Sequence, residues 1–279
     1  MASLFFPKKN RQSVHVLYAC LRHMDDVVDT GPSNLRDLSD LKEQIFGSSS
    51  SPHFIALQQI IKTKNIPPHF FADFLEGLRM DLANDRYQSL RDLELYCFRV
   101  AGVVGLMMCP LMGVTRFAAL NPACALGIAM QLTNVCRDIK EDAINNRVYV
   151  PCELLSKDVE AANLVKQPEL AHAAVIKILH RAEVLYKEGQ EGLVHLPFRS
   201  ALAVAVASVL YREIGRKLLA RSRKNAHLTM NQRTVVGGFA KLKCVMVGSL
   251  IAIVSRFQKQ SPSLSELPIQ DWNYVQHFY

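Results

Sequence analysis

Apolar residues recur at the spacing of an α-helix along most of the chain, and this periodicity constrains the fold more than any other feature of the sequence. One stripe near the N-terminus consists of Val14, Leu17, Leu21, Met24 and Val28. Its steps of three and four residues place every member on one helix face. No stretch alternates apolar and polar residues between turn signals, as half-buried strands do. The sequence therefore predicts an all-α fold, a single-domain helical bundle around a central hydrophobic cavity.

Clusters of Gly, Pro, Ser and Asn between the stripes set the expected helix boundaries. The predicted helices cover residues 7–29, 35–46, 52–64, a stretch opened by residues 67–68, then 91–114, 121–144, 168–189, 198–222 and 231–256. Asn121 is expected to cap the helix in which Pro122 takes the first position. We expect one helical domain over residues 1–257 and a loosely packed C-terminal tail over residues 258–279.

Composition narrows the class of protein. The chain has 279 residues, of which 49% are hydrophobic, enough for a large buried core. Its seven Cys are scattered without a C-x-x-C pair, which argues against a disulfide framework or a zinc site and favours a reducing compartment. No charged-then-apolar leader is visible, so we expect a cytoplasmic protein.

Membrane contact is a separate question. Uncharged runs over residues 100–115 and 245–255 are shorter than the ~20 residues of a membrane span, and both are expected to be buried core helices. The formal net charge of +8 leaves a peripheral contact with anionic lipid open.

Two pairs of aspartates carry the strongest chemical signal. Asp25 and Asp29 stand four residues apart on one predicted helix, and Asp138 and Asp142 do so on another. Like charges at that spacing share a helix face and destabilise it, so a bound cation is expected to offset them. Carboxylate oxygens with room for water and phosphate suit Mg²⁺. An ordinary ion-pair network, with Arg137 and Lys140 around the second pair, is the alternative.

Other polar residues accompany the aspartates. Gln131 and Asn134 continue the helix face of Asp138 and Asp142 beyond a fully apolar stretch, where polar groups need partners. The basic residues beside the two clusters are Arg22, Arg137 and Arg147. Guanidinium groups hold phosphate oxygens by paired hydrogen bonds, although salt bridges to the aspartates are the alternative. Together these residues favour a metal-dependent enzyme that acts on a diphosphate.

At this point the residues resemble a known family, the squalene/phytoene synthases. The resemblance rests on residues 18–29 with Tyr18, Arg22, Asp25, Asp26 and Asp29, on residues 81–87 and 96–105, on residues 131–142 and 146–151, and on residues 196–197 and 211–215. It covers nearly the whole chain in order. The late segment is most similar to the bacterial phytoene synthases.

The resemblance implies a reaction and roles for the residues. Two geranylgeranyl diphosphates would condense head to head (1-1′), through a cyclopropyl diphosphate, to phytoene, a step of carotenoid biosynthesis. Three Mg²⁺ ions would be held by Asp25, Asp29, Asn134, Asp138 and Asp142. Substrate would be bound by Tyr18, Arg22, Gln131, Arg137 and Arg147. Tyr87 and Tyr211 would stabilise cations, and core packing is the alternative for each. No NADPH is expected, and no G-x-G-x-x-G is found.

Three alternatives stay open at this stage. A squalene, dehydrosqualene or hydroxysqualene synthase that uses farnesyl diphosphate would share the same fold, because the depth of the cavity decides substrate length. A family relative without catalysis would act as an assembly or binding protein, which the intact aspartates argue against. Residues 212–243 are rich in Lys and Arg, but no recognition motif accompanies them, so nucleic acid is not expected as a partner.

Overall fold

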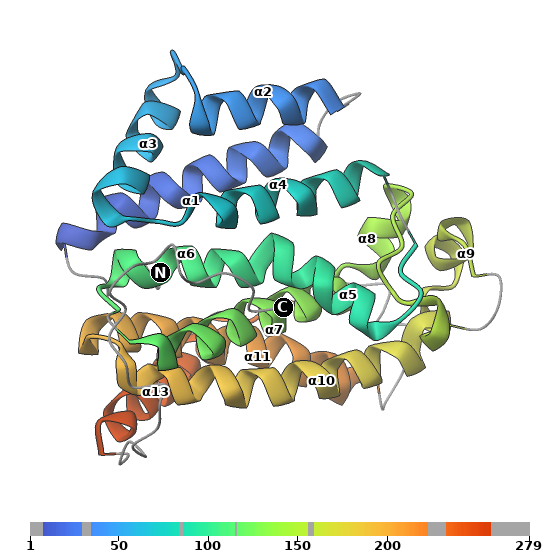
Figure 1. Cartoon of the computed structure of the whole chain (residues 1–279). Helices are drawn as coiled ribbons and strands as arrows, with labels where there is room; N and C mark the ends of the chain where they lie inside the picture. The colour runs from blue at the N-terminus through green and yellow to red at the C-terminus, as the bar shows by residue number, and fades with distance from the viewer. Residues whose placement is uncertain are drawn as a thin grey trace.

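The computed structural model describes residues 8–29, 35–83, 86–114, 116–155, 159–222 and 233–257. Within these ranges the regular elements are helices, which confirms the all-α prediction (Figure 1). The predicted tail over residues 258–279 lies outside the described residues.

The N-terminal helices form one side of the bundle. They are α1 (Lys8–Asp29), α2 (Leu35–Phe46), α3 (Pro52–Lys64) and α4 (Pro68–Ala83). The apolar stripe of α1 is buried, with Met24 fully inaccessible to solvent. The predicted bounds of α2 and α3 are confirmed, because a glycine follows one helix and a proline begins the other.

The helix predicted over residues 91–114 consists of several segments. α5 (Leu90–Cys97) passes into the π-helical turn η2 (Phe98–Gly102) and then into α6 (Val103–Met112). Ser89 caps α5 through a capping box with Asp92. Gly113 ends α6 with a φ of 79°, a conformation that other residues rarely adopt.

The central helix α7 (Leu120–Arg137) lies between α6 on one side and α10 and α11 on the other (Figure 1). The prediction that Asn121 caps this helix is wrong. A 3₁₀ turn over Phe117–Ala119 leads directly into α7, so Ala119 is the cap residue and Pro122 falls within the first turn, where a missing N–H is tolerated.

Glycines allow α7 to approach its neighbour closely. A Cβ added at Gly127 would lie 2.3 Å from the carbonyl oxygen of Ala101, and one at Gly105 would lie 2.3 Å from that of Ala123. No side chain fits at either position, so this crossing depends on glycine at both.

The second half of the chain adds α8 (Ile139–Ile144), α9 (Ala161–Lys166), α10 (His172–Glu191), α11 (Phe198–Ser222) and α13 (Gly238–Val254). The prediction for residues 198–222 is confirmed. The helix predicted from residue 168 begins with the 3₁₀ turn Pro168–Ala171. Within the described residues, the helix predicted from residue 231 begins only at Gly238, and residues 233–237 have no regular secondary structure.

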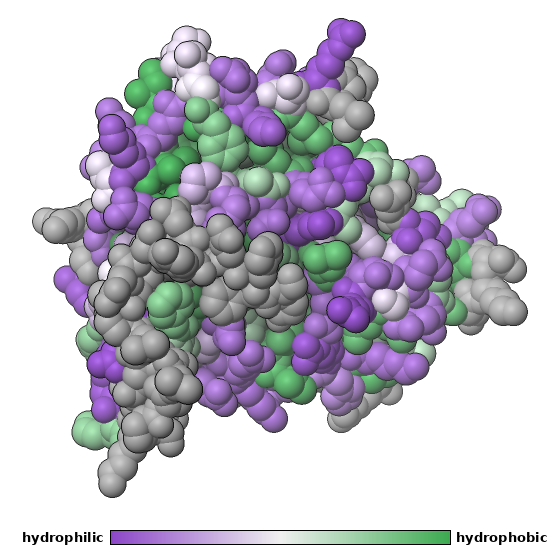
Figure 2. Space-filling view, in the orientation of Figure 1, coloured by the Kyte–Doolittle hydropathy of each residue, from purple (hydrophilic) through white to green (hydrophobic). Residues whose placement is uncertain are grey.

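The two longest apolar helices differ in burial. Leu90–Met112 and Gly238–Phe257 are both long and apolar enough to cross a membrane. In the most apolar 18-residue stretch of each, 56% of the first is buried inside the protein but only 22% of the second. The prediction of a buried core helix is therefore wrong for residues 245–255, whose large side chains face outward. The face in Figure 2 shows hydrophilic residues interspersed with smaller hydrophobic areas.

Candidate functional site

The second aspartate cluster lies where α7 ends and α8 begins, and the prediction of one continuous helix through it is wrong. Asp138 joins the two helices, with φ −106° and ψ 13°. The backbone hydrogen bonds nevertheless continue, from the Asp138 N–H to the Asn134 carbonyl (2.9 Å) and from the Asp142 N–H to the Asp138 carbonyl (2.8 Å). The four-residue spacing of these side chains is therefore kept across the break.

Asp138 is paired with two arginines. The Nε of Arg137 donates to its Oδ1 at 2.8 Å, and a second nitrogen of the same guanidinium contacts Oδ2. Arg233, in the irregular segment before α13, places Nε 3.2 Å from the same Oδ1 and Nη1 3.5 Å from Glu141. The sequence analysis placed Arg233 only within a basic stretch, because nothing in the local pattern connects it to Asp138.

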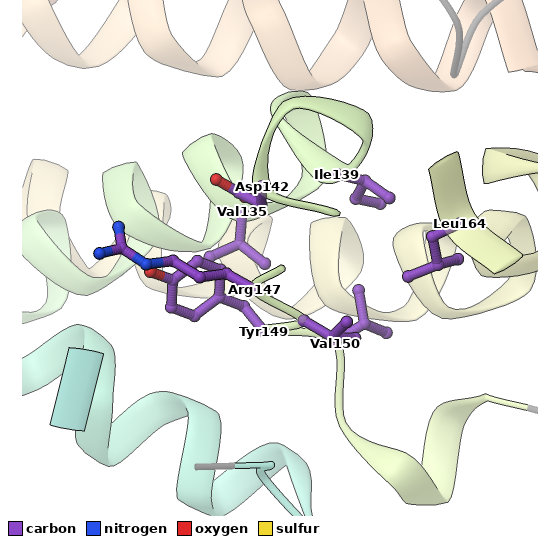
Figure 3. A pocket seen from close by; sticks show the side chains of 8 residues that line it. Val135, Ile139, Asp142, Arg147, Tyr149, Val150 and Leu164 are labelled. Carbon is purple, nitrogen blue, oxygen red and sulfur yellow. The ribbon is translucent and has the colours of Figure 1, made fainter. Parts of the chain in front are cut away.

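Asp142 lines a small pocket beside α8. Figure 3 shows Asp142, Arg147 and Tyr149 on one side of this pocket and apolar side chains on the other. The pKa of the Asp142 carboxyl is raised to about 8, chiefly by burial and also by the Asp138 carboxylate, while the Arg147 guanidinium opposes the rise. A buried carboxyl among acidic neighbours is a group that a cation would stabilise.

Asp81, near the end of α4, is a site residue that the sequence analysis did not assign. The hydroxyls of Tyr149 (2.6 Å) and Tyr96 (2.9 Å) both donate to its Oδ1. Burial raises the pKa of the Asp81 carboxyl to about 6 against these hydrogen bonds, and the Asp25 carboxylate adds to the rise. Asp81 lies in a segment that supported the family resemblance, but its buried partners come from elsewhere in the chain.

Three tyrosine rings form a cluster beside Asp81. Their centroids form a triangle, with Tyr96 5.4 Å from Tyr87 and 5.1 Å from Tyr149, and with Tyr87 and Tyr149 6.3 Å apart. Tyr87 is buried, as its alternative role in core packing requires, and its predicted role in stabilising cations stays a prediction.

The first aspartate cluster lies on the last turns of α1. Arg22 pairs with Asp25 at 3.2 Å and with Asp26 at 2.9 Å, as the salt-bridge alternative predicts. The side chain of Asp29 lies outside the described residues. Tyr18 is 69% exposed.

Tyr211 on α11 lies near side chains of α1 and of the α7–α8 junction. Burial raises the pKa of its hydroxyl, the Arg137 guanidinium opposes this, and Tyr18 and Asp138 add to the rise. These four side chains from α1, the α7–α8 junction and α11 therefore lie within electrostatic reach of one another.

The acidic groups also converge electrostatically. Asp25 raises the pKa of Asp81, and both Asp81 and Asp138 raise that of Asp142. Asp25 therefore lies within electrostatic reach of Asp81, and Asp81 and Asp138 lie within reach of Asp142. That the two clusters share bound metal ions stays a prediction.

The residues at this position fit a magnesium site. The Asn134 amide donates to Gln131 at 3.2 Å, while its Oδ1 is buried without a hydrogen-bond partner. Oxygen donors of this kind suit Mg²⁺. Within the described part of the chain, no three acidic, His or Cys side chains are already close enough to hold one ion, so Mg²⁺ binding would require the carboxylates to reorient.

The comparisons with known proteins agree with this geometry. The squalene/phytoene synthase family model matches residues 1–238. The chain is 36% identical to the 15-cis-phytoene synthase of Enterobacter agglomerans over 95% of both chains. It is 35% identical to that of Pantoea ananas over 95% of this chain and 91% of the relative.

Solved structures show the same fold. A dehydrosqualene synthase in complex with ligand has a TM-score of 0.73 at 29% identity, covering 91% of this chain and 90% of the other. A squalene synthase from Alicyclobacillus acidocaldarius has a TM-score of 0.69 at 26% identity, covering 81% and 87%. The fold and the site therefore define a prenyltransferase of the helical isoprenoid-synthase type. The chain belongs to the squalene/phytoene synthase family.

Proposed function

We propose that this prenyltransferase catalyses the Mg²⁺-dependent head-to-head condensation of two geranylgeranyl diphosphates, through a cyclopropyl diphosphate, to phytoene in carotenoid biosynthesis. The observation that carries the proposal is the electrostatic convergence of Asp25, Asp81, Asp138 and Asp142 from helices far apart in the chain. The relatives named 15-cis-phytoene synthase, which match over almost their whole length, support the choice of reaction.

The metal ions would be held by Asp25, Asp29, Asn134, Asp138 and Asp142. Bound Mg²⁺ neutralises diphosphate oxygens and so promotes departure of the diphosphate. Asn134 supplies a neutral oxygen that is already buried and unpaired, and Asp142 would release its proton when it becomes a ligand.

Arginines at the same place would hold the diphosphates. Arg137 and Arg233 pair with Asp138 when no ligand is present, and each has a planar set of donors that matches phosphate oxygens. When Asp138 turns to the metal, these guanidinium groups become available to the substrate. Arg22 and Arg147 have the same chemistry beside Asp25 and Asp142. Gln131, which accepts a hydrogen bond from the Asn134 amide, and Tyr18, exposed midway along α1, would bind substrate.

The tyrosines would protect the reacting cations. Aromatic faces stabilise positive charge in a dry site, and Tyr87 belongs to a buried cluster of tyrosines, two of which donate hydrogen bonds to the carboxylate of Asp81. Tyr211, beside Arg137, lies where the leaving diphosphate would be held.

Farnesyl diphosphate is the alternative substrate, since the structural relatives include a dehydrosqualene and a squalene synthase. The depth of the predicted hydrophobic cavity decides between the two chain lengths. We also propose that the protein is cytoplasmic with peripheral membrane contact, and that its reaction does not use NADPH.

Incubation of the purified protein with either prenyl diphosphate and Mg²⁺, with and without NADPH, tests the reaction by mass spectrometry of the hydrocarbon. We expect phytoene, unchanged by NADPH. Turnover of farnesyl diphosphate alone would refute the chain length, and an inert protein would favour the non-catalytic alternative.

A matched pair of variants tests the site. Asp138→Asn is expected to abolish turnover while the far-UV circular dichroism is retained. Asp40→Asn, on the exposed side of α2, is expected to leave turnover unchanged.

A further inference from the structure

Helix α13 has its large apolar side chains on the outside of the protein. The residues that it buries are small, namely Cys244, Gly248 and Ala252. Its outward face, continued by the turn that follows, carries Phe239 (86% exposed), Leu242 (59%), Met246 (67%), Leu250 (61%) and Phe257 (83%). With Ile253 (47% exposed), these residues recur every three or four positions and form one continuous stripe, which is the reverse of the usual arrangement for a surface helix.

Packing against α11 fixes this orientation. A Cβ added at Gly248 would lie 2.7 Å from the Cα of Val206, so the two backbones are in close contact at that point. Rotation of α13 to bury its large side chains would require the helices to separate. The exposure of the apolar stripe is therefore a specified property of the packing.

Positive charge accompanies the stripe. Lys241 and Lys243 are exposed and flank Leu242 on α13. Residues 233–257 contain four Lys or Arg and neither Asp nor Glu. On the adjacent α11, Arg216 is also exposed and lies 3.9 Å from Glu213. Figure 1 places α13 at the edge of the bundle.

We propose that the outward face of α13 docks the protein on an anionic lipid bilayer. A helix with a large exposed apolar stripe flanked by lysines lies in the plane of the interface, with its apolar side chains among the acyl chains and its cations at the headgroups. A transmembrane orientation would require α13 to leave α11. A second copy of the chain is a less suitable partner for this face. It would bring Lys241 and Lys243 of both chains together, and residues 233–257 have no carboxylate to pair with them.

The location suits the proposed chemistry, and this part of the argument rests on the proposed function. A prenyl donor with a long hydrocarbon chain, and a hydrocarbon product without any polar group, both partition into lipid. A protein held at the bilayer surface would exchange them without passage through water.

Vesicle co-sedimentation of the full-length protein without substrate tests the proposal. Vesicles of phosphatidylcholine alone are compared with vesicles that also contain phosphatidylglycerol. We expect binding that increases with phosphatidylglycerol content. Leu242→Ser combined with Leu250→Ser should weaken it about tenfold or more. Replacement of Lys241 and Lys243 by Gln should weaken binding to the anionic vesicles about fivefold for each lysine and have little effect on the neutral ones.

Val184→Ser is the matched control, because Val184 on α10 is 52% exposed but lies outside the stripe. It should bind vesicles as the parent does. Equal binding by all variants, or none by the parent, would overturn the proposal. The proposal would also be overturned if sedimentation equilibrium showed that the parent is a dimer and that the double serine variant is a monomer. Loss of thermal stability in that variant, without vesicle binding by the parent, would show that the chain itself covers the face. Because no substrate is present, the proposal and the prenyl-transfer reaction can fail independently.

Discussion

Asp81→Asn should stabilise the metal-free protein at neutral pH. The pKa of this carboxyl is raised from 3.8 to about 6 in the folded chain, chiefly by burial. The folded state therefore holds the proton more tightly than the unfolded state, and folding is favoured by protonation. The resulting stability is fully present below pH ~4 and is lost as the pH rises through about 6.

The size of the effect follows from that shift. Each pKa unit corresponds to about 1.4 kcal/mol, so the ionised Asp81 lowers the free energy of unfolding by roughly 3 kcal/mol above pH 6. Asparagine carries no charge, and its Oδ1 can accept the hydrogen bonds that Tyr96 and Tyr149 now donate to Asp81 Oδ1. The variant should therefore gain most of this free energy at pH 7.5 and none at pH 4.

Urea unfolding with EDTA at both pH values measures the gain. Asp92→Asn is the control with the opposite sign, because hydrogen bonds from Ser89 lower the pKa of Asp92 at the start of α5. Its contribution is present at neutral pH and lost in acid, so this variant should gain nothing at pH 7.5. An Asp81→Asn protein that is no more stable than the parent at pH 7.5 would refute the electrostatic reasoning. Turnover should fall in the same variant, since stability gained at a functional site commonly costs activity.

Other measurements test the packing and the site. In a urea titration, Gly127→Ala should lower the free energy of unfolding by about 1–3 kcal/mol, because the new Cβ would lie 2.3 Å from a backbone oxygen. Gly238→Ala is the control, because no atom lies within 4 Å of its added Cβ, and it should change the free energy of unfolding by less than ~0.5 kcal/mol. Calorimetry should give an apparent Mg²⁺ affinity that rises about tenfold per pH unit and levels off above the pKa of about 8 of Asp142, and a flat profile would count against Asp142 as a ligand. Thr133→Val removes the hydroxyl that lies 2.9 Å from the buried Tyr186 hydroxyl, and it should lower the free energy of unfolding by about 1–3 kcal/mol. Adding Tyr186→Phe should restore part of this stability, as measured by thermal unfolding.

Local sequence was sufficient where a helix has a clear beginning and end. The bounds of α2, α3 and α11 were predictable because Gly, Ser or Pro flanks a regular apolar stripe. Four-residue spacing also identified the aspartates, and that spacing survived the change of helix at Asp138 because the backbone hydrogen bonds continue through it. The break itself had no local signal.

Tertiary partners account for the site residues that the sequence did not reveal. Asp81 acquires its properties from the hydroxyls of Tyr96 and Tyr149, and Arg233 from its pairing with Asp138. Such pairs join segments that come together only when the bundle forms. A pattern confined to one window of sequence contains no information about them.

Helix α13 shows that the average hydrophobicity of a segment does not reveal which of its side chains are buried. Leu90–Met112 and Gly238–Phe257 are equally apolar, yet the first is mainly buried and the second is mainly exposed. Small residues recur every four positions in α13, at Cys244, Gly248 and Ala252, and these determine which face packs on α11. Since only a narrow strip of a helix can contact its neighbour so closely, the large side chains between the small ones must point outward. The order of small and large residues, rather than total hydrophobicity, was therefore the signal that separated a core helix from a helix with a free apolar face.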